Sequence, residues 1–372
     1  MTSVRHNIRR IPVAVDINKL FQTMLRSGIS DIHFKAGTPP MVRIHGRLMS
    51  SGFNKMGAEH IQELAQLLMN ENQRAIFERD NELDMSYSVP DLSRFRVNVY
   101  RQKGTVALSL RVVPLQVKSF EELNLPAETM RKLCHNTRGM LLVAGITGAG
   151  KTTTLNSMVD FINKNFAYNM IMIEDPIEYY HTNDKSSIAQ REVGQDTPSF
   201  GSAVKHLLRQ DPDVVVLGEM RDAESIQAGI TAAETGHLVL GTIHTMDASQ
   251  TMGRLLESYH PAEQAGAKAR IANVLKGIVA QRLLESADGR ERFPATETLV
   301  VTSLIRKLLM EEKSNEVNRA IEQGAYYGMH SFDQDIIRLF NEHKITKEEA
   351  LDASTNPDDL LVKMNTLRLG DA

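Results

Sequence analysis

Residues 145–152 read GITGAGKT and directly follow the apolar run MLLVA. Three glycines in eight positions cost backbone entropy and bury no side chain, so a local function has to explain them. The stretch fits the phosphate-loop pattern G-x-x-x-x-G-K-[ST] at Gly145, Gly150, Lys151 and Thr152. That pattern requires a strand before it and a helix after it, and the flanking runs predict both. The sequence therefore predicts an α/β domain that binds a nucleoside triphosphate.

The loop residues suggest how the triphosphate would be held. Glycines let backbone N–H groups turn toward phosphate oxygens, and the new helix presents its positive end to the same anion. Lys151 is expected to reach the β- and γ-phosphates of ATP, and the Thr152 hydroxyl to bind Mg²⁺. The other residues expected to bind nucleotide here are Gly145, Thr147, Gly148, Ala149, Gly150 and Thr153. The alternative is a tight glycine turn followed by a solvated lysine.

Composition limits the remaining possibilities. A length of 372 residues suggests two domains, each with its own core. The longest apolar stretches, such as 141–146 and 214–218, are much shorter than the ~20 residues that cross a bilayer. The N-terminus has no apolar signal core, and the single cysteine, Cys134, precludes an internal disulfide, so we expect a cytoplasmic protein. A net charge of −3 gives no general attraction to nucleic acid.

Residues 1–113 are predicted to form a small α+β domain. Amphipathic runs predict helices at INKLFQTMLRSG and IQELAQLLM and strands at DIHFKA and MVRIHG. The run SRFRVNVYRQKGTVALSLRVVP predicts a hairpin that turns near Lys103 and Gly104. Residues 114–126 have a proline at each end and little periodicity, which suggests a linker.

Residues 127–372 alternate short apolar strands with helices. The strands MLLVA, NMIMIE, VVVLGE and HLVLGTIH are almost continuously apolar, which is typical of a parallel sheet covered on both faces. Such a sheet binds its ligand at the carboxyl ends of its strands. We also predict a core-facing helix over 267–284 and a polar, mostly helical tail from about residue 300.

Three stretches place polar residues at these strand ends. Glu174, Asp175 and Glu178 follow one strand, Glu219 follows the next, and His237 and His244 flank the last. Each has a simpler explanation, since acidic residues after strands are often helix caps and single histidines are often structural. Their joint occurrence after a phosphate loop favours nucleotide hydrolysis, which needs groups that orient water and metal.

The motifs together resemble those of the secretion ATPases of type II secretion and type IV pilus machines. IEDPIEYYH is similar to the family's Asp box, RQDPDVVVLGEMRD to its Walker B motif and AAETGHLVLGTIHT to its His box. SDIHFKAGTPPMVRIHGRL and REVGQDTPSF extend the resemblance along the chain. It implies a PAS-like N-terminal domain, a RecA-like ATPase domain with C-terminal helices, and a homo-hexameric ring with nucleotide between the domains.

The resemblance also implies roles for single residues. Glu178 corresponds to the base that polarises the attacking water, and Glu219 to the carboxylate that acts on Mg²⁺ and its water. His244, with His237, would sense the γ-phosphate. Within the family the likeness is to the pilus retraction ATPases, because one cysteine leaves no room for the tetracysteine zinc module of the extension and type II secretion ATPases.

The predicted hairpin supplies two further candidates. Alternation places Arg96 and Arg111 on the face opposite the apolar residues and close to each other across the strands. Like charges so placed repel, and a bound anion would relieve this. Since the family's motifs put nucleotide-reaching arginines here, Arg96 and Arg111 are predicted charge-stabilising fingers, with a solvated strand face as the alternative. Weaker candidates are Arg94, Arg101 and Lys103.

One motif departs from the family. Retraction ATPases usually carry a helix reading AIRNLIRE, and residues 304–311 read LIRKLLME, with Met310 in place of the second arginine. The resemblance as a whole implies a Mg²⁺-dependent ATPase motor for pilus retraction and twitching motility at the cytoplasmic face of the inner membrane, and this departure bears on retraction rather than on ATP hydrolysis. Expected partners are a membrane platform protein and a paralogous pilus ATPase. Alternatives are an accessory paralogue, a RecA-like nucleic-acid translocase, a non-hydrolysing scaffold and a small-molecule kinase.

Overall fold

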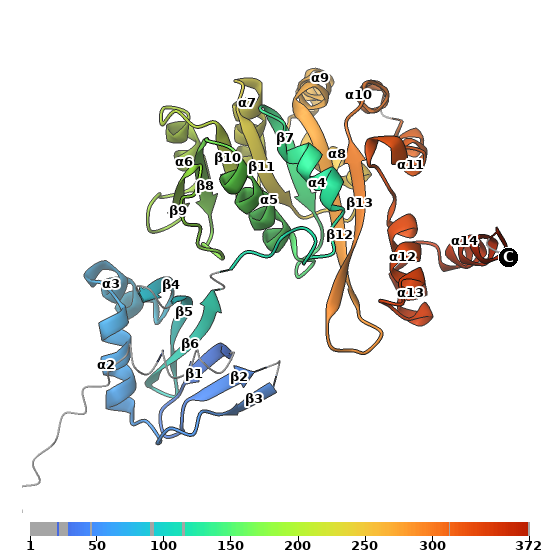
Figure 1. Ribbon diagram of the computed structural model, residues 1–372. Coiled ribbons are helices and arrows are strands. Elements are labelled where there is room, and N and C mark those ends of the chain that lie inside the picture. The colour runs from blue at the N-terminus through green and yellow to red at the C-terminus, as the bar shows by residue number, and fades with distance from the viewer. Residues whose placement is uncertain are drawn as a thin grey trace, which may run out of the picture. The chain divides into compact units, whose positions relative to one another are not determined.

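The computed structural model divides into two compact units, residues 1–115 and 116–372. It describes residue 21 and residues 29–44, 47–89, 93–113, 116–311 and 313–370. Figure 1 gives the element labels, and each unit is described by itself. The helix predicted over INKLFQTMLRSG lies outside the described residues, apart from Phe21.

Unit 1 is an antiparallel sheet in the order β3-β2-β1-β6-β5-β4. Its strands are β1 (Ile29–Phe34), β2 (Met41–Ile44), β3 (Arg47–Ser50), β4 (Glu82–Val89), β5 (Ser93–Gln102) and β6 (Thr105–Val113). The helices are α2 (Ala58–Leu68) and α3 (Glu71–Asp80). Ile61 and Leu64 of α2 share one buried core with Phe95, Leu108 and Leu110 of the sheet, so α2 covers one face.

The predicted hairpin is confirmed. β5 and β6 pair from Arg94↔Val113 to Gln102↔Thr105, and the turn between them is Lys103–Gly104, both with positive φ. Arg96 lies directly opposite Arg111. The register is fixed because a slip of one residue would exchange the buried and exposed faces of both strands.

Unit 2 contains a seven-stranded sheet in the order β13-β12-β7-β11-β10-β8-β9. All neighbouring strands are parallel except the antiparallel pair β12–β13. The strands are β7 (Gly139–Ala144), β8 (Asn169–Glu174), β9 (Ser187–Glu192), β10 (Val214–Leu217), β11 (Leu238–Ile243), β12 (Leu275–Glu285) and β13 (Arg292–Val300). Every residue of β7, β10 and β11 is buried, which confirms a parallel sheet covered on both faces.

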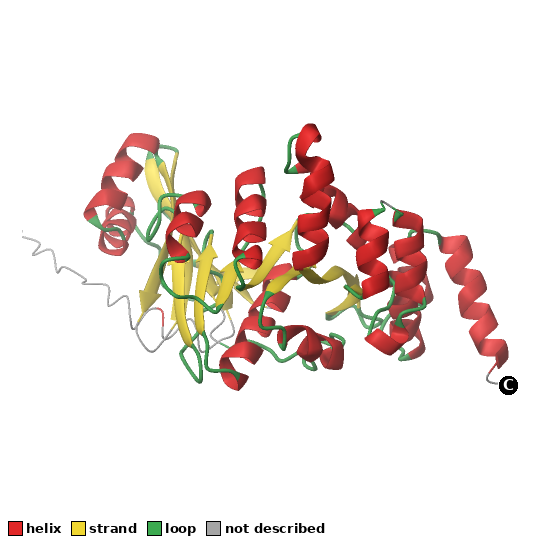
Figure 2. Cartoon of the chain, turned by 90° about the horizontal axis from the view of Figure 1, so that it is seen from above, coloured by secondary structure: helices red, strands yellow, loops and turns green. Residues whose placement is uncertain are grey.

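Helices lie on both faces of the sheet (Figure 2), and an apolar core fills the space on each side. Leu141 and Val143 of β7 pack with α4 and α5, whereas Met140 and Leu142 belong to the core on the other face. Helices before the last strand are α4 (Ala127–Cys134), α5 (Lys151–Asn165), α6 (Phe200–Leu207), α7 (Ala223–Glu234), α8 (Ala248–Glu257), η1 (Pro261–Glu263) and α9 (Gln264–Val274). The C-terminal tail contains α10 (Ser303–Met310), α11 (Ser314–Glu322), η2 (Ala325–Tyr327), α12 (Phe332–Asn341), α13 (Lys347–Ala353) and α14 (Pro357–Gly370). The tail is helical, as predicted.

The helix predicted over 267–284 is wrong in its second half. α9 ends at Val274, and β12 begins at Leu275 and runs parallel to β7, with Ile278 opposite Leu142. A fully buried strand shows apolar residues at consecutive positions, so its pattern is easily confused with that of a buried helix. The correction brings residues 280 and 281 beside the phosphate loop.

The segment predicted as a linker, 114–126, is mostly part of unit 2. Phe120 and Leu125 are buried in the core beneath α4 and α5. The hydroxyl of Ser157 on α5 also donates to the carbonyl of Lys118, at 2.8 Å. Among the described residues, the structure contains no helix whose length and apolar character suit a bilayer crossing.

Candidate nucleotide site

The phosphate loop occupies residues 145–150, between the end of β7 and the start of α5 at Lys151. Gly145, Gly148 and Gly150 have φ values of +155°, +80° and +86°, which side-chain-bearing residues adopt only with strain. Thus the glycines serve the backbone path of the loop. The strand-loop-helix context that the motif requires is present.

Lys151 is buried at the base of this loop, with 7% of its surface exposed. Its Nζ donates to the carbonyls of Gly145, at 2.9 Å, and Ile146, at 3.0 Å. Burial lowers the pKa of Lys151, and the negative charges of Glu219 and Glu178 oppose that shift. The fold therefore brings the predicted lysine and both predicted carboxylates into one electrostatic neighbourhood.

Glu219 lies just beyond β10 and is held from two sides. Its Oε2 accepts a hydrogen bond from Arg221 at 2.8 Å, and its Oε1 contacts Nε2 of His244. Burial alone would raise the pKa of Glu219, but Arg221, His244 and Lys151 outweigh it and lower the pKa below its usual value. Glu219 is therefore an ionised acceptor next to Lys151, and His244 contacts it directly.

Arg221 also belongs to this site, although no sequence motif singled it out. Arg221 donates to Glu219 through Nη2, and its Nη1 lies 4.0 Å from a carboxylate oxygen of Asp175, the residue after β8. It thus connects the acidic residues that follow two adjacent strands. Two features of the sequence could have pointed to Arg221. It follows Glu219 by two residues, and Asp175 follows another strand of the same predicted sheet.

The acidic residues after β8 divide into structural and accessible ones. Glu174 is buried, and its carboxylate accepts a hydrogen bond from Gln190 at 2.8 Å, so it belongs to the scaffold. Glu178 is exposed. The neighbouring Tyr179 holds this segment against α5, because its hydroxyl lies 3.0 Å from the hydroxyl of Thr153. Glu178 is thus an accessible carboxylate on an anchored segment.

A buried pair supports the first turn of α5. The amide of Asn156 donates to the carbonyl of Thr152 at 2.8 Å, and the Asn156 oxygen lies 2.6 Å from Nε2 of His181. Since that oxygen can only accept, Nε2 of His181 donates. Burial lowers the pKa of His181 to about 4, so the imidazole is neutral near pH 7. This pair fixes Thr152 relative to the segment that carries Glu178.

The structure places His237 away from this chain's own phosphate loop. His237 precedes β11, and its carbonyl accepts from the amide of Gly139, the first residue of β7. Its Nδ1 lies 2.9 Å from the carbonyl of Ala232 at the end of α7. Because strands of six residues span about 20 Å, His237 lies at the edge of the sheet opposite the loop. Sequence proximity to His244 did not reveal this, because the two histidines flank a whole strand.

In unit 1 the expected repulsion between Arg96 and Arg111 is already relieved on one side. Asp31 of β1 lies opposite Arg111 and accepts from its Nε at 2.9 Å. Arg111 therefore has a carboxylate partner in the absence of a bound anion. Arg96 is exposed.

Among the described residues, no group of three or more His, Cys, Asp or Glu side chains is arranged to hold a metal ion. The expected magnesium ligands, Thr152 and Glu219, are one hydroxyl and one ionised carboxylate. Mg²⁺ prefers oxygen ligands and usually keeps several waters beside one or two protein groups and substrate phosphates. This donor set therefore fits Mg²⁺.

Known proteins resemble this chain over nearly its whole length. The profile of the family described as Type II/IV secretion system protein matches residues 9–348. The type IV pilus retractation ATPase PilT of Pseudomonas aeruginosa is 36% identical over 345 residues, which cover 93% of this chain and 100% of the relative. The type IV pilus ATPase PilU of the same organism is also 36% identical, over 93% of this chain and 90% of the relative.

A solved structure is similar in fold as well. The crystal structure of the pilus retraction motor PilT with bound ADP superposes with a TM-score of 0.86 at 40% sequence identity. It covers 92% of this chain and 98% of the other. The predicted fold class, a PAS-like α+β domain followed by a RecA-like ATPase domain with a helical tail, is confirmed.

Proposed function

This chain belongs to the family of type II/IV secretion system proteins, and from that premise we propose that it is an ATP hydrolase whose turnover drives type IV pilus retraction. The main observation is the convergence of Lys151, Glu178 and Glu219 at the carboxyl edge of a parallel sheet. A phosphate loop alone binds nucleotide, whereas this trio supplies charge compensation and an accessible carboxylate for water. The similarity to an ADP-bound retraction motor supports the assignment.

In this mechanism the triphosphate lies on the backbone amides of the loop and the amino end of α5. Lys151 would exchange its carbonyl partners for the β- and γ-phosphates. Glu178 would accept a hydrogen bond from water and orient it in line with the γ-phosphate. His244, in contact with Glu219, would respond when the γ-phosphate is present or lost.

Mg²⁺ would be held by the Thr152 hydroxyl and the Glu219 carboxylate. When bound, it would supply positive charge that offsets the negative charge of the triphosphate. The partners of these two groups preset their positions. Asn156 fixes the carbonyl of Thr152, and Arg221 keeps Glu219 ionised and oriented.

Arg96 and Arg111 remain proposed charge-stabilising fingers. Arg96 is the stronger candidate, because its side chain is exposed. Arg111 is the weaker one, because it is already paired with Asp31. We further propose a homo-hexameric ring at the cytoplasmic face of the inner membrane, where it acts on a pilus platform protein. Movement of one unit against another on γ-phosphate loss would be the power stroke.

An accessory pilus motor is the second candidate function. The chain is equally identical to PilT and PilU of one organism. In α10 the family's second arginine is replaced by Met310, whose side chain is 46% exposed, while Arg306 bonds the carbonyl of Ala272 at 3.1 Å. The exposed surface of α10 therefore carries one positive charge fewer than in the family motif. The contact of Arg306 that attaches the helix to α9 is present.

Deleting the gene in its native host tests the function. We expect surplus surface pili and lost twitching, restored by the wild-type gene but not by Lys151→Ala. The matched control is Lys132→Ala, which removes an exposed lysine of α4 that pairs with Glu128. Loss of pilus assembly on deletion would contradict a retraction motor. Normal retraction in the deletion strain, with a defect only when a paralogue is also removed, would support the accessory role.

A further inference from the structure

Gln281 lies beside the phosphate loop because of its place in β12. Its neighbour Ala280 pairs with Ala144, the last residue before the loop, so Gln281 continues alongside Gly145. Only 2% of the Gln281 surface is exposed. The residue escaped notice in the sequence because its segment was predicted to be a helix.

Both ends of the Gln281 carboxamide are bonded to the loop or to α5. Its Oε1 accepts from the hydroxyl of Thr154 at 2.7 Å, and its Nε2 donates to the carbonyl of Ala149. A Cβ at Gly150 would lie 2.8 Å from Nε2 of Gln281, and one at Gly145 would lie 2.7 Å from the Gln281 carbonyl oxygen. The two glycines that bound the loop therefore pack against this one residue.

We propose that Gln281 is a positioning residue that holds the phosphate loop in its nucleotide-binding conformation, an inference that rests on the proposed ATPase function. A glycine-rich loop loses much conformational entropy when it closes around phosphate. Fixing Ala149 and Thr154 in advance reduces the entropy lost on binding, which raises affinity. Gln281 acts through the loop and does not touch the phosphates.

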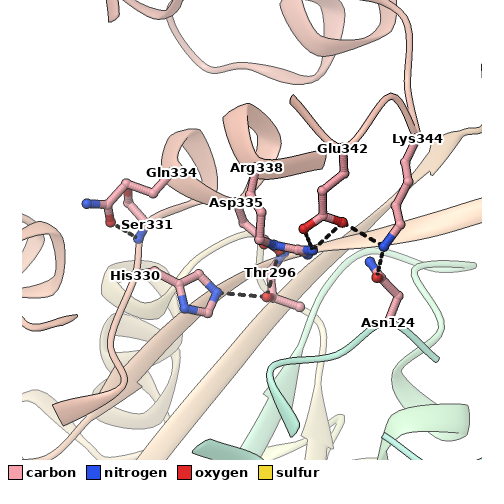
Figure 3. Close-up of polar contacts among 9 residues, drawn as sticks. All are labelled: Asn124, Thr296, His330, Ser331, Gln334, Asp335, Arg338, Glu342 and Lys344. Carbon is pink, nitrogen blue, oxygen red and sulfur yellow. Dashed lines mark hydrogen bonds and ion pairs between the residues drawn. The ribbon is translucent and has the colours of Figure 1, made fainter. Parts of the chain in front are cut away.

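The strand next to the one that carries Gln281, β13, is itself anchored on its far side (Figure 3). Thr296 of β13 lies directly opposite Gln281. Its backbone amide and hydroxyl both donate to Asp335 of α12, at 2.7 and 2.9 Å, and His330 Nε2 lies 2.8 Å from the hydroxyl. Because the Thr296 proton goes to the carboxylate, His330 is the donor in that contact.

This network continues away from β13. Arg338 bonds Asp335 at 2.7 Å and reaches Glu342, which pairs with Lys344, and Lys344 contacts Asn124. The β12–β13 pair is thus attached to α12 and to the segment before α4. Gln281 therefore connects the phosphate loop to a part of unit 2 that is fixed by the buried Thr296–Asp335 contacts and by partly exposed ion pairs beyond them.

The first test replaces the donor end of the carboxamide. In Gln281→Glu an ionised carboxylate accepts from Thr154 but cannot donate to Ala149, whereas a protonated carboxyl can do both. We expect ADP, titrated by calorimetry, to bind about 10-fold more weakly than to the wild type at pH 8. Most of that ratio should be recovered at pH 6, because burial raises the pKa of a carboxyl group. Melting temperatures measured at both pH values distinguish this recovery from a change in folding stability.

The controls separate positioning from stability. Gln281→Met should lose ADP affinity at both pH values, and Thr154→Val combined with it should add little further loss. Gln227→Met, which removes an amide that donates to the carbonyl of Ser258 from α7, should leave affinity unchanged. Melting temperatures without nucleotide report any folding defect, and the milder Thr154→Val provides the test if Gln281→Met unfolds.

Two outcomes have distinct meanings. Unchanged ADP affinity in Gln281→Met and Thr154→Val would overturn the positioning role while leaving the ATPase assignment intact. Failure of the wild type itself to bind ADP would contradict the proposed function.

Discussion

At the scale of single residues, the site is a balance of charges that compensate one another before nucleotide arrives. Lys151 is buried, which disfavours its charge, and Glu219 and Glu178 favour it. Glu219 is in turn kept ionised by Arg221, His244 and Lys151. Polar and charged groups fixed in this way need little reorganisation during catalysis. Chemistry therefore depends on groups that the fold has already oriented.

Glu178 gives the sharpest residue-level prediction. Glu178→Gln removes the base but keeps the size and exposure of the side chain, so turnover should fall by at least ~100-fold. ADP affinity and melting temperature should change little. Steady-state ATP hydrolysis and ADP calorimetry measure these effects. The control is Glu122→Gln, which replaces an exposed carboxylate near the start of unit 2. Near-normal turnover in Glu178→Gln would remove this residue from its role.

The proposed arginine fingers make a second prediction. Arg96→Gln should lower kcat by ~10³-fold, the usual minimum contribution of an arginine finger, with a smaller effect on ADP binding. Arg111→Gln should cost less activity, because Asp31 already neutralises Arg111. Arg79→Gln, which removes an exposed arginine paired with Asp80 on α3, is the control. Equal kcat in Arg96→Gln and Arg79→Gln would leave Arg96 as a solvated strand residue.

At the scale of elements, the carboxyl ends of parallel strands gather the site. β7 delivers the phosphate loop, β8 the segment with Glu178, β10 Glu219 and β11 His244. Adjacent parallel strands end at one edge, so residues far apart in sequence become neighbours. The same geometry places His237 at the other edge of the sheet. The direction of β11 therefore determines that His244, and not His237, lies on the side of the phosphate loop.

A buried carboxyl in β13 makes an element-level prediction. Glu297 accepts from the amide of Ala248 at the start of α8, 2.9 Å away, and burial, aided by Asp247, raises its pKa to about 7. The native state therefore binds this proton more tightly than the unfolded state. The stabilisation is complete below pH 4.5 and is lost as pH rises toward about 7.

Glu297→Gln should reduce that pH dependence. Glutamine keeps an acceptor for Ala248 and never ionises. Between pH 5 and pH 8, the unfolding free energy of the variant should therefore fall by about 2 kcal/mol less than that of the wild type. Urea unfolding at both pH values makes the comparison, and Glu291→Gln, on an exposed residue before β13, is the control. Parallel pH profiles for Glu297→Gln and the wild type would contradict the raised pKa.

At the scale of the whole molecule, the proposed motor requires several copies of the chain. We expect light scattering in Mg²⁺ and ATP to give the mass of six copies. Turnover per chain should rise with protein concentration until the ring is complete, because a ring assembles by mass action. The inactive Glu178→Gln variant should assemble equally well. A monomer with full, concentration-independent turnover would contradict the ring.

The sequence by itself determined the phosphate loop, the buried parallel strands, the hairpin register and the family, because each depends on local spacing or on strict alternation. The hairpin is an example, since Phe95 and Leu108 had to share a face and so fixed Arg96 opposite Arg111. These features require no knowledge of distant contacts.

Only the tertiary structure decided which residues meet. Buried apolar runs look alike in helices and strands, so β12, and with it Gln281, became visible only through pairing with β7. The neutralisation of Arg111 by Asp31 and the bridge of Arg221 between Asp175 and Glu219 likewise join different strands. Local patterns specify elements, whereas the partners of a polar group are set by how those elements pack.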